Sequence, residues 1–293
     1  MPKTQEISAL SWTWATTGYS FAGWPDAKII RLCRHAGLSG IEWNAERCAG
    51  KSDADLVRIR RAYRAAELKL DSFHLPMNPE DDVASFYETF RRATVERFLR
   101  LLEQAARLGC RVVILHPSTN RLSTKTEGLD WYLRQLDKSL RTLLPRAASL
   151  RLAIALENML PGERGGRLGS SPAHFVRFRR AFDHSALGFC LDTGHALVAG
   201  GPMGPAAFFD AMAPRLIAFH LADNAGDRDS HLAPGHGLVD WKAVFSRLHR
   251  LGYRHPACIE TPPFAHGPNA SYSLTAWRKM VADTAALAAK AHP

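Results

Sequence analysis

Six short apolar segments of the sequence each end on a side chain that can bind a metal ion. In chain order, these terminal residues are His74, His116, Glu157, Asp192, His220 and Glu260. Imidazoles and carboxylates buried together at one place need a compensating charge, which a divalent cation supplies. Mixed nitrogen and oxygen ligands suit zinc, manganese, iron or cobalt better than calcium or a thiolate-bound structural zinc. The series therefore predicts a divalent metal site.

Each of these residues also has a purely structural explanation. A lone histidine at a strand end is usually just hydrogen-bonded, and an aspartate or glutamate there often caps the next helix. Six such residues in chain order, each directly after an apolar run, favour a shared site over six separate roles. We expect one ion (Mn, Zn, Co, Fe or Mg), with two or three ions as the alternative.

Alternating strands and helices would bring these residues together. Short apolar or β-branched runs predict strands over residues 7–14, 40–44, 70–74, 111–116, 152–157, 187–192, 216–220 and 257–261. Longer amphipathic runs predict helices over residues 53–66, 84–108, 132–148, 173–182, 241–251 and 273–290. Gly37, Gly109 and Gly252 lie shortly before strands, where a left-handed helix end is wanted.

This alternation predicts an α/β fold, a single (β/α)8 TIM barrel over residues 1–293. No linker, repeat or low-complexity tract divides the chain. In such a barrel the carboxyl ends of the strands converge on one mouth, where active sites lie. An open doubly wound sheet is the alternative. It would normally carry a glycine-rich phosphate loop after its first strand, and residues 11–14 (Ser-Trp-Thr-Trp) offer none.

Length and composition fit this fold. The 293 residues are 46% apolar and 23% charged, which excludes a disordered or low-complexity chain, and such barrels need about 250 residues. No apolar stretch approaches the ~18–20 residues of a membrane span. The N-terminus lacks the apolar core of a signal peptide, and the five cysteines show no C-x-x-C spacing. We therefore expect a cytoplasmic protein.

The formal net charge of +10 raises the alternative of a nucleic-acid partner. The basic residues, however, cluster in helical segments, at residues 58–64 and 91–107. Helices form the outer ring of a barrel, away from its active face, so we interpret these clusters as a solvated surface. A polyanion-binding surface is the alternative.

Three segments carry a resemblance to a known family: ALENM at 155–159, LDTGHA at 191–196 and DSHLAPGHG at 229–237. They resemble the xylose-isomerase-like TIM-barrel superfamily, in particular its sugar phosphate isomerase/epimerase branch. The resemblance implies a core metal set of Glu157, Asp192, His220 and Glu260, with His195 beside the metal and the substrate. It also implies that Glu157 and Glu260 move the proton, while His195 holds or protonates a substrate oxygen.

The sequence also resembles the endonuclease IV group of the same superfamily, which carries a trinuclear zinc site. The matching ligands are His74, His116, Glu157, Asp192, His195, His220, Asp229, His231 and Glu260. One residue separates Asp229 from His231, so in an extended segment both side chains face the same way, as two ligands of one ion would. Two features depart from that group. Met77 stands in place of a tyrosine, and residues 8–19 do not match the DNA-binding stretch, whereas residues 234–241 resemble a sugar-isomerase loop.

Four further residues are candidate substrate contacts. Trp14, at the end of the first predicted strand, is placed to stack on a sugar face, and Glu42 of the second is placed to orient the substrate. Glu163 lies six residues after Glu157, a spacing also seen in some ketose epimerases, and Arg164 is a candidate for binding a phosphate or carboxylate. Core packing, helix capping and an exposed turn are the alternative roles.

We therefore expect a metal-dependent isomerase or epimerase of a sugar, polyol or related keto compound, acting through an enediolate-type proton transfer. The alternatives are an endonuclease IV-like phosphodiesterase that cleaves abasic DNA, or a lyase or dehydratase on the same fold. The expected partner is a sugar-like small molecule. Nucleic acid is not favoured, a membrane is not expected, and a homo-oligomer is left open.

Overall fold

Eight parallel strands close into a barrel in the computed structural model, which describes residues 12–21, 23–119, 122–261 and 273–291. The strands are β1 (Trp14–Thr17), β2 (Gly40–Asn44), β3 (Ser72–His74), β4 (Val112–Leu115), β5 (Ala153–Glu157), β6 (Leu187–Asp192), β7 (Leu216–Leu221) and β8 (Ala257–Ile259). They pair in chain order, and β8 pairs with β1 to close the barrel. The predicted (β/α)8 fold is confirmed.

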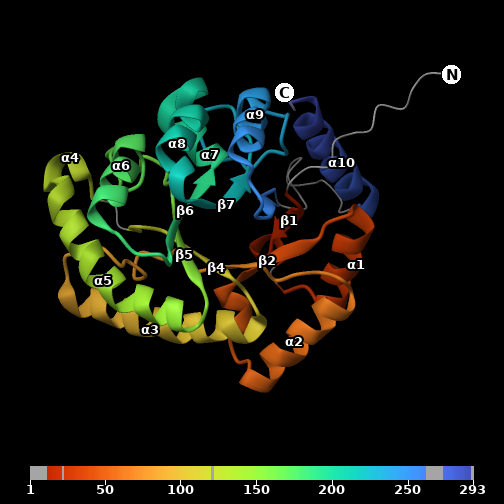
Figure 1. The fold of residues 1–293 in the computed structure, drawn as a ribbon, viewed down its shortest axis with the longest axis horizontal. Coiled ribbons are helices and arrows are strands. Elements are labelled where there is room, and N and C mark those ends of the chain that lie inside the picture. The colour runs from red at the N-terminus through yellow and green to blue at the C-terminus, as the bar shows by residue number, and fades with distance from the viewer. Residues whose placement is uncertain (1–11, 22, 120–121, 262–272, 292–293) are drawn as a thin grey trace.

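Helices form a ring outside the strands (Figure 1). They are α1 (Asp26–Ala36), α2 (Asp53–Ala65), α3 (Glu88–Leu108), α4 (Thr124–Glu127), α5 (Leu129–Ser149), α6 (Pro172–Ala181), α7 (Thr193–Gly200), α8 (Gly204–Met212), α9 (Trp241–Leu251) and α10 (Leu274–Lys290). Short 3-10 segments are η1 (Tyr19–Phe21), η2 (Ala45–Cys48), η3 (Gly201–Met203) and η4 (Ala213–Arg215). The predicted stops Gly37, Gly109 and Gly252 end α1, α3 and α9 in the left-handed conformation.

The first strand lies further along the chain than predicted. β1 begins at Trp14, the last residue of the predicted strand 7–14, of which residues 7–11 lie outside the described part of the chain. Thr16 and Thr17 are fully buried and pair with β2, because β-branched threonine suits a strand as well as an apolar residue does. Trp12 instead stacks on Phe245 of α9, with 6.2 Å between ring centroids.

The barrel interior explains why the polar residues gather at one end. Every second side chain of a strand faces the interior. Below the mouth, the interior side chains of β4 to β7 are apolar: Val112, Ile114, Ala155, Cys190 and Ala218. Two positions after the last four of these residues come His116, Glu157, Asp192 and His220. The period of two therefore places these polar side chains in one layer at the carboxyl ends of the strands, called the mouth below.

Larger apolar side chains pack between the strands and the helices. The ring of Phe189 in β6 lies 5.2 Å from that of Phe175 in α6, which lies 6.0 Å from that of Phe208 in α8. All three side chains are fully buried, so this layer attaches the helices to the sheet. Within the described residues, the helices are all too short or too polar to cross a membrane.

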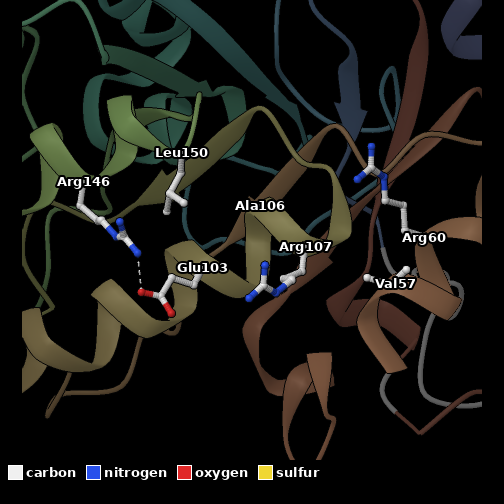
Figure 2. Close-up of a pocket in the computed structure, with 7 residues that line it drawn as sticks. All are labelled: Val57, Arg60, Glu103, Ala106, Arg107, Arg146 and Leu150. Carbon is white, nitrogen blue, oxygen red and sulfur yellow. Dashed lines mark hydrogen bonds and ion pairs between the residues drawn. The ribbon is translucent and has the colours of Figure 1, made fainter. Parts of the chain in front are cut away.

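Basic residues line the outer ring, as predicted. A pocket of about 360 Å³ between α2, α3 and α5 gathers Arg60, Arg107 and Arg146 (Figure 2). Arg146 lies 2.7 Å from Glu103, and Arg107 lies 2.7 Å from Asp53. Acids thus neutralise two of the three arginines through exposed ion pairs, each of which contributes little to stability. This arrangement is typical of a solvated helix surface.

Helices α7 and α8, which follow β6, were not predicted. Residues 193–209 contain no lysine, arginine, aspartate or glutamate, so the segment shows no amphipathic period from which a helix could be recognised. The two helices approach closely at Gly204, where an added Cβ would collide with the backbone carbonyl of Ala196 in α7.

We expect Gly204→Ala to lower the free energy of unfolding by about 1–3 kcal/mol, because backbone must move to make room for the methyl group. The matched control is Gly200→Ala in the same helix pair, where no described atom lies within 4 Å of the added Cβ. Thermal melts should show a lower Tm for Gly204→Ala alone. Equal Tm values for the two variants would contradict the close approach.

Candidate metal centre

The polar strand ends predicted to share a site do meet at the mouth. Four sets of candidate ligand atoms each lie within 4.8 Å of one another. Two of them face the mouth: Glu157, Asp192, His220 and Glu260 in one set, and His74, His116 and Glu157 in the other. The remaining two include a residue of the layer below: Glu42 with His74 and His220, and Cys190 with Glu157 and His220. Every member except the half-buried His74 is buried. Glu157 belongs to both sets at the mouth.

The two carboxylate oxygens of Glu157 face different histidines. Oε2 lies 3.0 Å from Nε2 of His116 and 3.4 Å from Nε2 of His74. Oε1 lies 3.2 Å from Nδ1 of His220. One carboxylate therefore lies between the two sets of candidate ligands at the mouth and could contribute an oxygen to each.

A third group, formed by the contacts of Asp229 with two further histidines, lies beside the two sets at the mouth. Oδ2 of Asp229 is 3.2 Å from Nε2 of His195 and 2.9 Å from Nε2 of His231. Asp229 and His231 thus face the same way, as predicted, but the segment is not extended. His231 has a φ of 46°, in the left-handed region that costs a non-glycine residue about 1–3 kcal/mol and recurs at functional sites.

Backbone carbonyls orient three of the histidines. Nδ1 of each ring donates to a carbonyl oxygen, in the pairs His74–Leu75 (2.7 Å), His195–Asn158 (2.8 Å) and His231–Glu260 (3.0 Å). A carbonyl oxygen can only accept, so Nδ1 carries a proton in each ring. Nε2 is therefore the nitrogen that each ring presents to the carboxylates at the mouth.

The carboxylates at the mouth are only partly satisfied by other described residues. Asp192 Oδ2 and Asp229 Oδ1 are buried without a hydrogen-bond partner, whereas Glu157 Oε2 and Glu260 Oε2 lie 3.0 Å and 2.9 Å from His116 and His220. Burial raises the pKa of Asp192 to about 8. Burial alone would lower the pKa values of His74 and His231, but their contacts with Glu157 and Asp229 raise both to about 9. A divalent cation satisfies such oxygens and replaces these protons, so the donor set fits a metal ion.

Asn158 holds the backbone of the predicted ligand Asp192, a role that the sequence did not predict. The side-chain amide of Asn158 donates to the backbone carbonyl of Asp192 at 2.9 Å, and its oxygen accepts from the Asp192 N–H at 2.7 Å. Oδ1 of Asp192 caps α7 by accepting from the N–H of His195 at 2.6 Å. This cap leaves Oδ2 of Asp192 for a metal ion. The position of Asn158 directly after Glu157 was the available signal.

Asp223 holds the segment that carries Asp229 and His231. Its buried carboxylate accepts hydrogen bonds from the N–H groups of Gly235 and Val239, both at 3.0 Å, and from Nε1 of Trp241 at 2.8 Å. Three donors from residues 235–241 thereby converge on one side chain three positions after His220. The carboxylate organises the loop rather than binding an ion.

A pocket of about 280 Å³ opens over the ligands. Its lining residues are Tyr19, Asn44, Glu46, His74, Leu75, Met77, His116, Glu157, His195, Asp229, His231 and Glu260. Tyr19, Asn44 and Glu46 were not predicted. Asn44 ends β2 at the level of His74, and its buried Oδ1 has no partner among the described residues, so the end of a predicted strand was the missed signal.

The described lining of the pocket contains neither Trp14 nor Glu42, two of the predicted substrate contacts. Trp14 pairs with Ala257, the first residue of β8, at the end of the barrel opposite the mouth, and its ring packs against Phe245. The shift of the first strand explains this error. Glu42 faces the interior one layer below Asn44, beneath His220, rather than the pocket.

Glu163 and Arg164 also lie away from the ligands. Both are exposed in the loop between β5 and α6, and the described residues that line the pocket include neither. Gly162, Gly165 and Gly166 all have positive φ angles and turn this segment outward. A spacing of six residues after Glu157 therefore does not bring Glu163 to the mouth.

A closed barrel with candidate metal ligands at its mouth defines the class of protein. Residues 30–280 match the family model for the xylose isomerase-like TIM barrel, and the chain belongs to this family. It is 28% identical over 278 residues to the uncharacterized protein y4fM of Sinorhizobium fredii, covering 86% of this chain and 85% of that protein. It is 30% identical over 180 residues to a protein of Oleidesulfovibrio alaskensis named "Probable endonuclease 4", covering 55% and 58%.

A solved structure described as a D-tagatose 3-epimerase-like protein has the same fold. It superposes with a TM-score of 0.77 at 22% sequence identity, covering 95% of this chain and 98% of the other.

We expect divalent metal binding to release protons and to strengthen with pH. His74 and His231, with pKa values of about 9, and Asp192, with a pKa of about 8, hold protons at neutral pH. A metal ion must displace them, so affinity should rise as the pH passes through these values. Titration calorimetry with Mn²⁺, in buffers of different ionisation enthalpy from about pH 7 to 9, measures both effects. An affinity that is constant over this range would contradict the expectation.

Proposed function

We propose that the protein is a divalent-metal-dependent isomerase or epimerase of a sugar, polyol or related keto compound. The observation that carries the proposal is the placement of Glu157 and Glu260 at the same imidazole, 3.2 Å and 2.9 Å from Nδ1 of His220, beneath a pocket of about 280 Å³. That volume suits a small molecule. The name of the D-tagatose 3-epimerase-like neighbour supports the same substrate class.

Glu157, Asp192, His220 and Glu260 would hold the ion. A bound divalent ion supplies Lewis-acid polarisation of the substrate carbonyl, which acidifies the neighbouring C–H. Glu157 of β5 and Glu260 after β8 then reach the substrate carbon from different sides of the mouth. One carboxylate removes the proton and the other returns a proton to the opposite face or the adjacent carbon.

His195 completes the set of proton-handling groups. It lines the pocket, and because its Nδ1 is bound to the carbonyl of Asn158, its Nε2 is the atom that reaches a substrate oxygen. A proton on Nε2 would stabilise negative charge on that oxygen as the C–H bond breaks. Asn158 thus fixes which nitrogen of His195 acts.

We expect Glu157→Gln and Glu260→Gln each to lower turnover by at least about 10²-fold, since an amide cannot accept the proton. In heavy water, the wild-type protein should introduce label at the carbon beside the carbonyl of its substrate, or transfer label to that carbon. The substrate is sought in a panel of ketoses, aldoses and related keto compounds. Glu163→Gln is the matched control, because Glu163 is exposed and away from the pocket. Full activity of both site variants would refute the proposed roles.

Metal-assisted phosphodiester hydrolysis is the second candidate function. The third group of ligands supports it, because His195, Asp229 and His231 would hold an additional ion that stabilises a leaving oxygen. The name of the endonuclease 4 relative points the same way. Robust cleavage of abasic-site DNA at physiological salt, with no labelling of any sugar in the panel, would favour this candidate over the isomerase.

We expect Asp229→Ala/His231→Ala to bind about one ion fewer per chain than the wild-type protein, because both ligands of the third group would be lost. Elemental analysis after loading with zinc measures the ratio, with Asp192→Ala as the control that disrupts the strand-end set instead. If the double variant keeps the full metal content and loses only substrate affinity, the pair belongs to the substrate and not to an ion.

A further inference from the structure

His220 is oriented in the opposite sense to the other histidines of the site. Its Nδ1 faces the mouth, 2.9 Å from Glu260 Oε2 and 3.2 Å from Glu157 Oε1. Its Nε2 faces down into the barrel, 3.2 Å from Oε2 of Glu42. His74, His195 and His231 instead turn Nε2 to the mouth and bind a backbone carbonyl through Nδ1.

Glu42 contacts His220 from the side remote from the substrate pocket. Both side chains are only 1% exposed, and both line a small cavity of about 20 Å³ inside the barrel, with Ser72 and Cys258. The described lining of the pocket at the mouth contains neither Glu42 nor His220. A substrate in that pocket would therefore meet His220 before Glu42, which leaves Glu42 no direct role in catalysis.

The position of Glu42 complements an ion bound on the other side of His220. An ion held by Glu157, Asp192 and Glu260 would take the lone pair of His220 Nδ1, which lies 2.9 Å from Glu260 Oε2 and 3.2 Å from Glu157 Oε1. The ring proton would then lie on Nε2, which is 3.2 Å from Oε2 of Glu42 and can donate to it. A carboxylate partner makes the imidazole a stronger metal ligand than a carbonyl partner would.

We propose that Glu42 is a positioning residue, which holds the Nε2–H of His220 so that Nδ1 binds the divalent ion, and which strengthens that ligand. The inference rests on the metal dependence proposed above. It predicts that a neutral residue of the same shape at position 42 weakens metal binding although the substrate pocket is unchanged.

The first test compares Glu42→Gln with Glu163→Gln, the same change at an exposed residue outside the described lining of the pocket. Affinity for Zn²⁺ is measured by competition with a chromophoric chelator, and circular dichroism and Tm are recorded for the metal-free proteins. Glu42→Gln should bind Zn²⁺ about 10–100-fold more weakly than the wild-type protein, whereas Glu163→Gln should stay within about twofold. A Glu42→Gln variant that binds Zn²⁺ as tightly as Glu163→Gln overturns the proposal.

The second test needs no change at position 42, so it decides the question even where Glu42→Gln fails to fold. In the zinc-loaded wild-type protein labelled with 15N-histidine, the ring signals of His220, assigned with His220→Gln, should show a protonated Nε2 and a metal-bound Nδ1. A metal-bound Nε2 overturns the proposal. Neither test uses a sugar, so a protein that passes both yet converts no sugar would refute the proposed reaction while leaving the role of Glu42 intact.

Discussion

The contact between the buried carboxylate of Glu157 and the imidazoles on either side of it is the interaction on which the whole mouth depends. Its two oxygens face His116 and His74 in one direction and His220 in the other. A carboxylate this deep is tolerated only when charged or hydrogen-bonding partners surround it. In this barrel the partners are three histidines in the same layer: His74 of β3, His116 directly after β4 and His220 of β7.

The geometry of the closed sheet brings the polar side chains at the strand ends together. Small side chains such as Ala155, Cys190 and Ala218 fill the layer below, and the alternation along each strand then lifts the next inward residue to the mouth. Neighbouring groups fix the orientation of the ligands. The Asn158 side chain hydrogen-bonds to the backbone of Asp192, and the backbone carbonyl of Asn158 orients the ring of His195. Most of the candidate ligands thus lie on strands or directly after them, where side chains are positioned more accurately than on loops.

Sequence reasoning predicted the barrel and the strand-end ligands because both follow from local patterns. An apolar run of five or six residues locates a strand, and the polar residue that ends it falls at the mouth. The same rule failed for Glu42, which lies two residues before the end of its strand and so faces the layer below. It failed for Trp14 because an aromatic run was taken for the first strand, whereas the buried threonines form it.

Residues that lie on loops could not be predicted from the ends of apolar strands. Tyr19, Glu46 and Asp223 follow strands by different distances, and only the folded path of each loop brings them to the pocket or to its support. For Glu163, the spacing of six residues after Glu157 predicted a position near the ligands, but Glu163 is exposed in a glycine-rich loop. Spacing along the chain predicts neighbours within a strand or helix, but it does not predict the course of a loop.

The left-handed backbone at His231 marks a difference between two kinds of residue at the mouth: those at strand ends, and Asp229 and His231 on a loop. The strand-borne ligands are in place as soon as the barrel closes, whereas Asp229 and His231 come together only when the segment anchored by Asp223 adopts its strained path. The contact between Asp229 and His231 therefore depends on the conformation of one loop, whereas the strand-end side chains depend on the barrel itself. Changes within that single loop can alter this part of the mouth without any change to the strands.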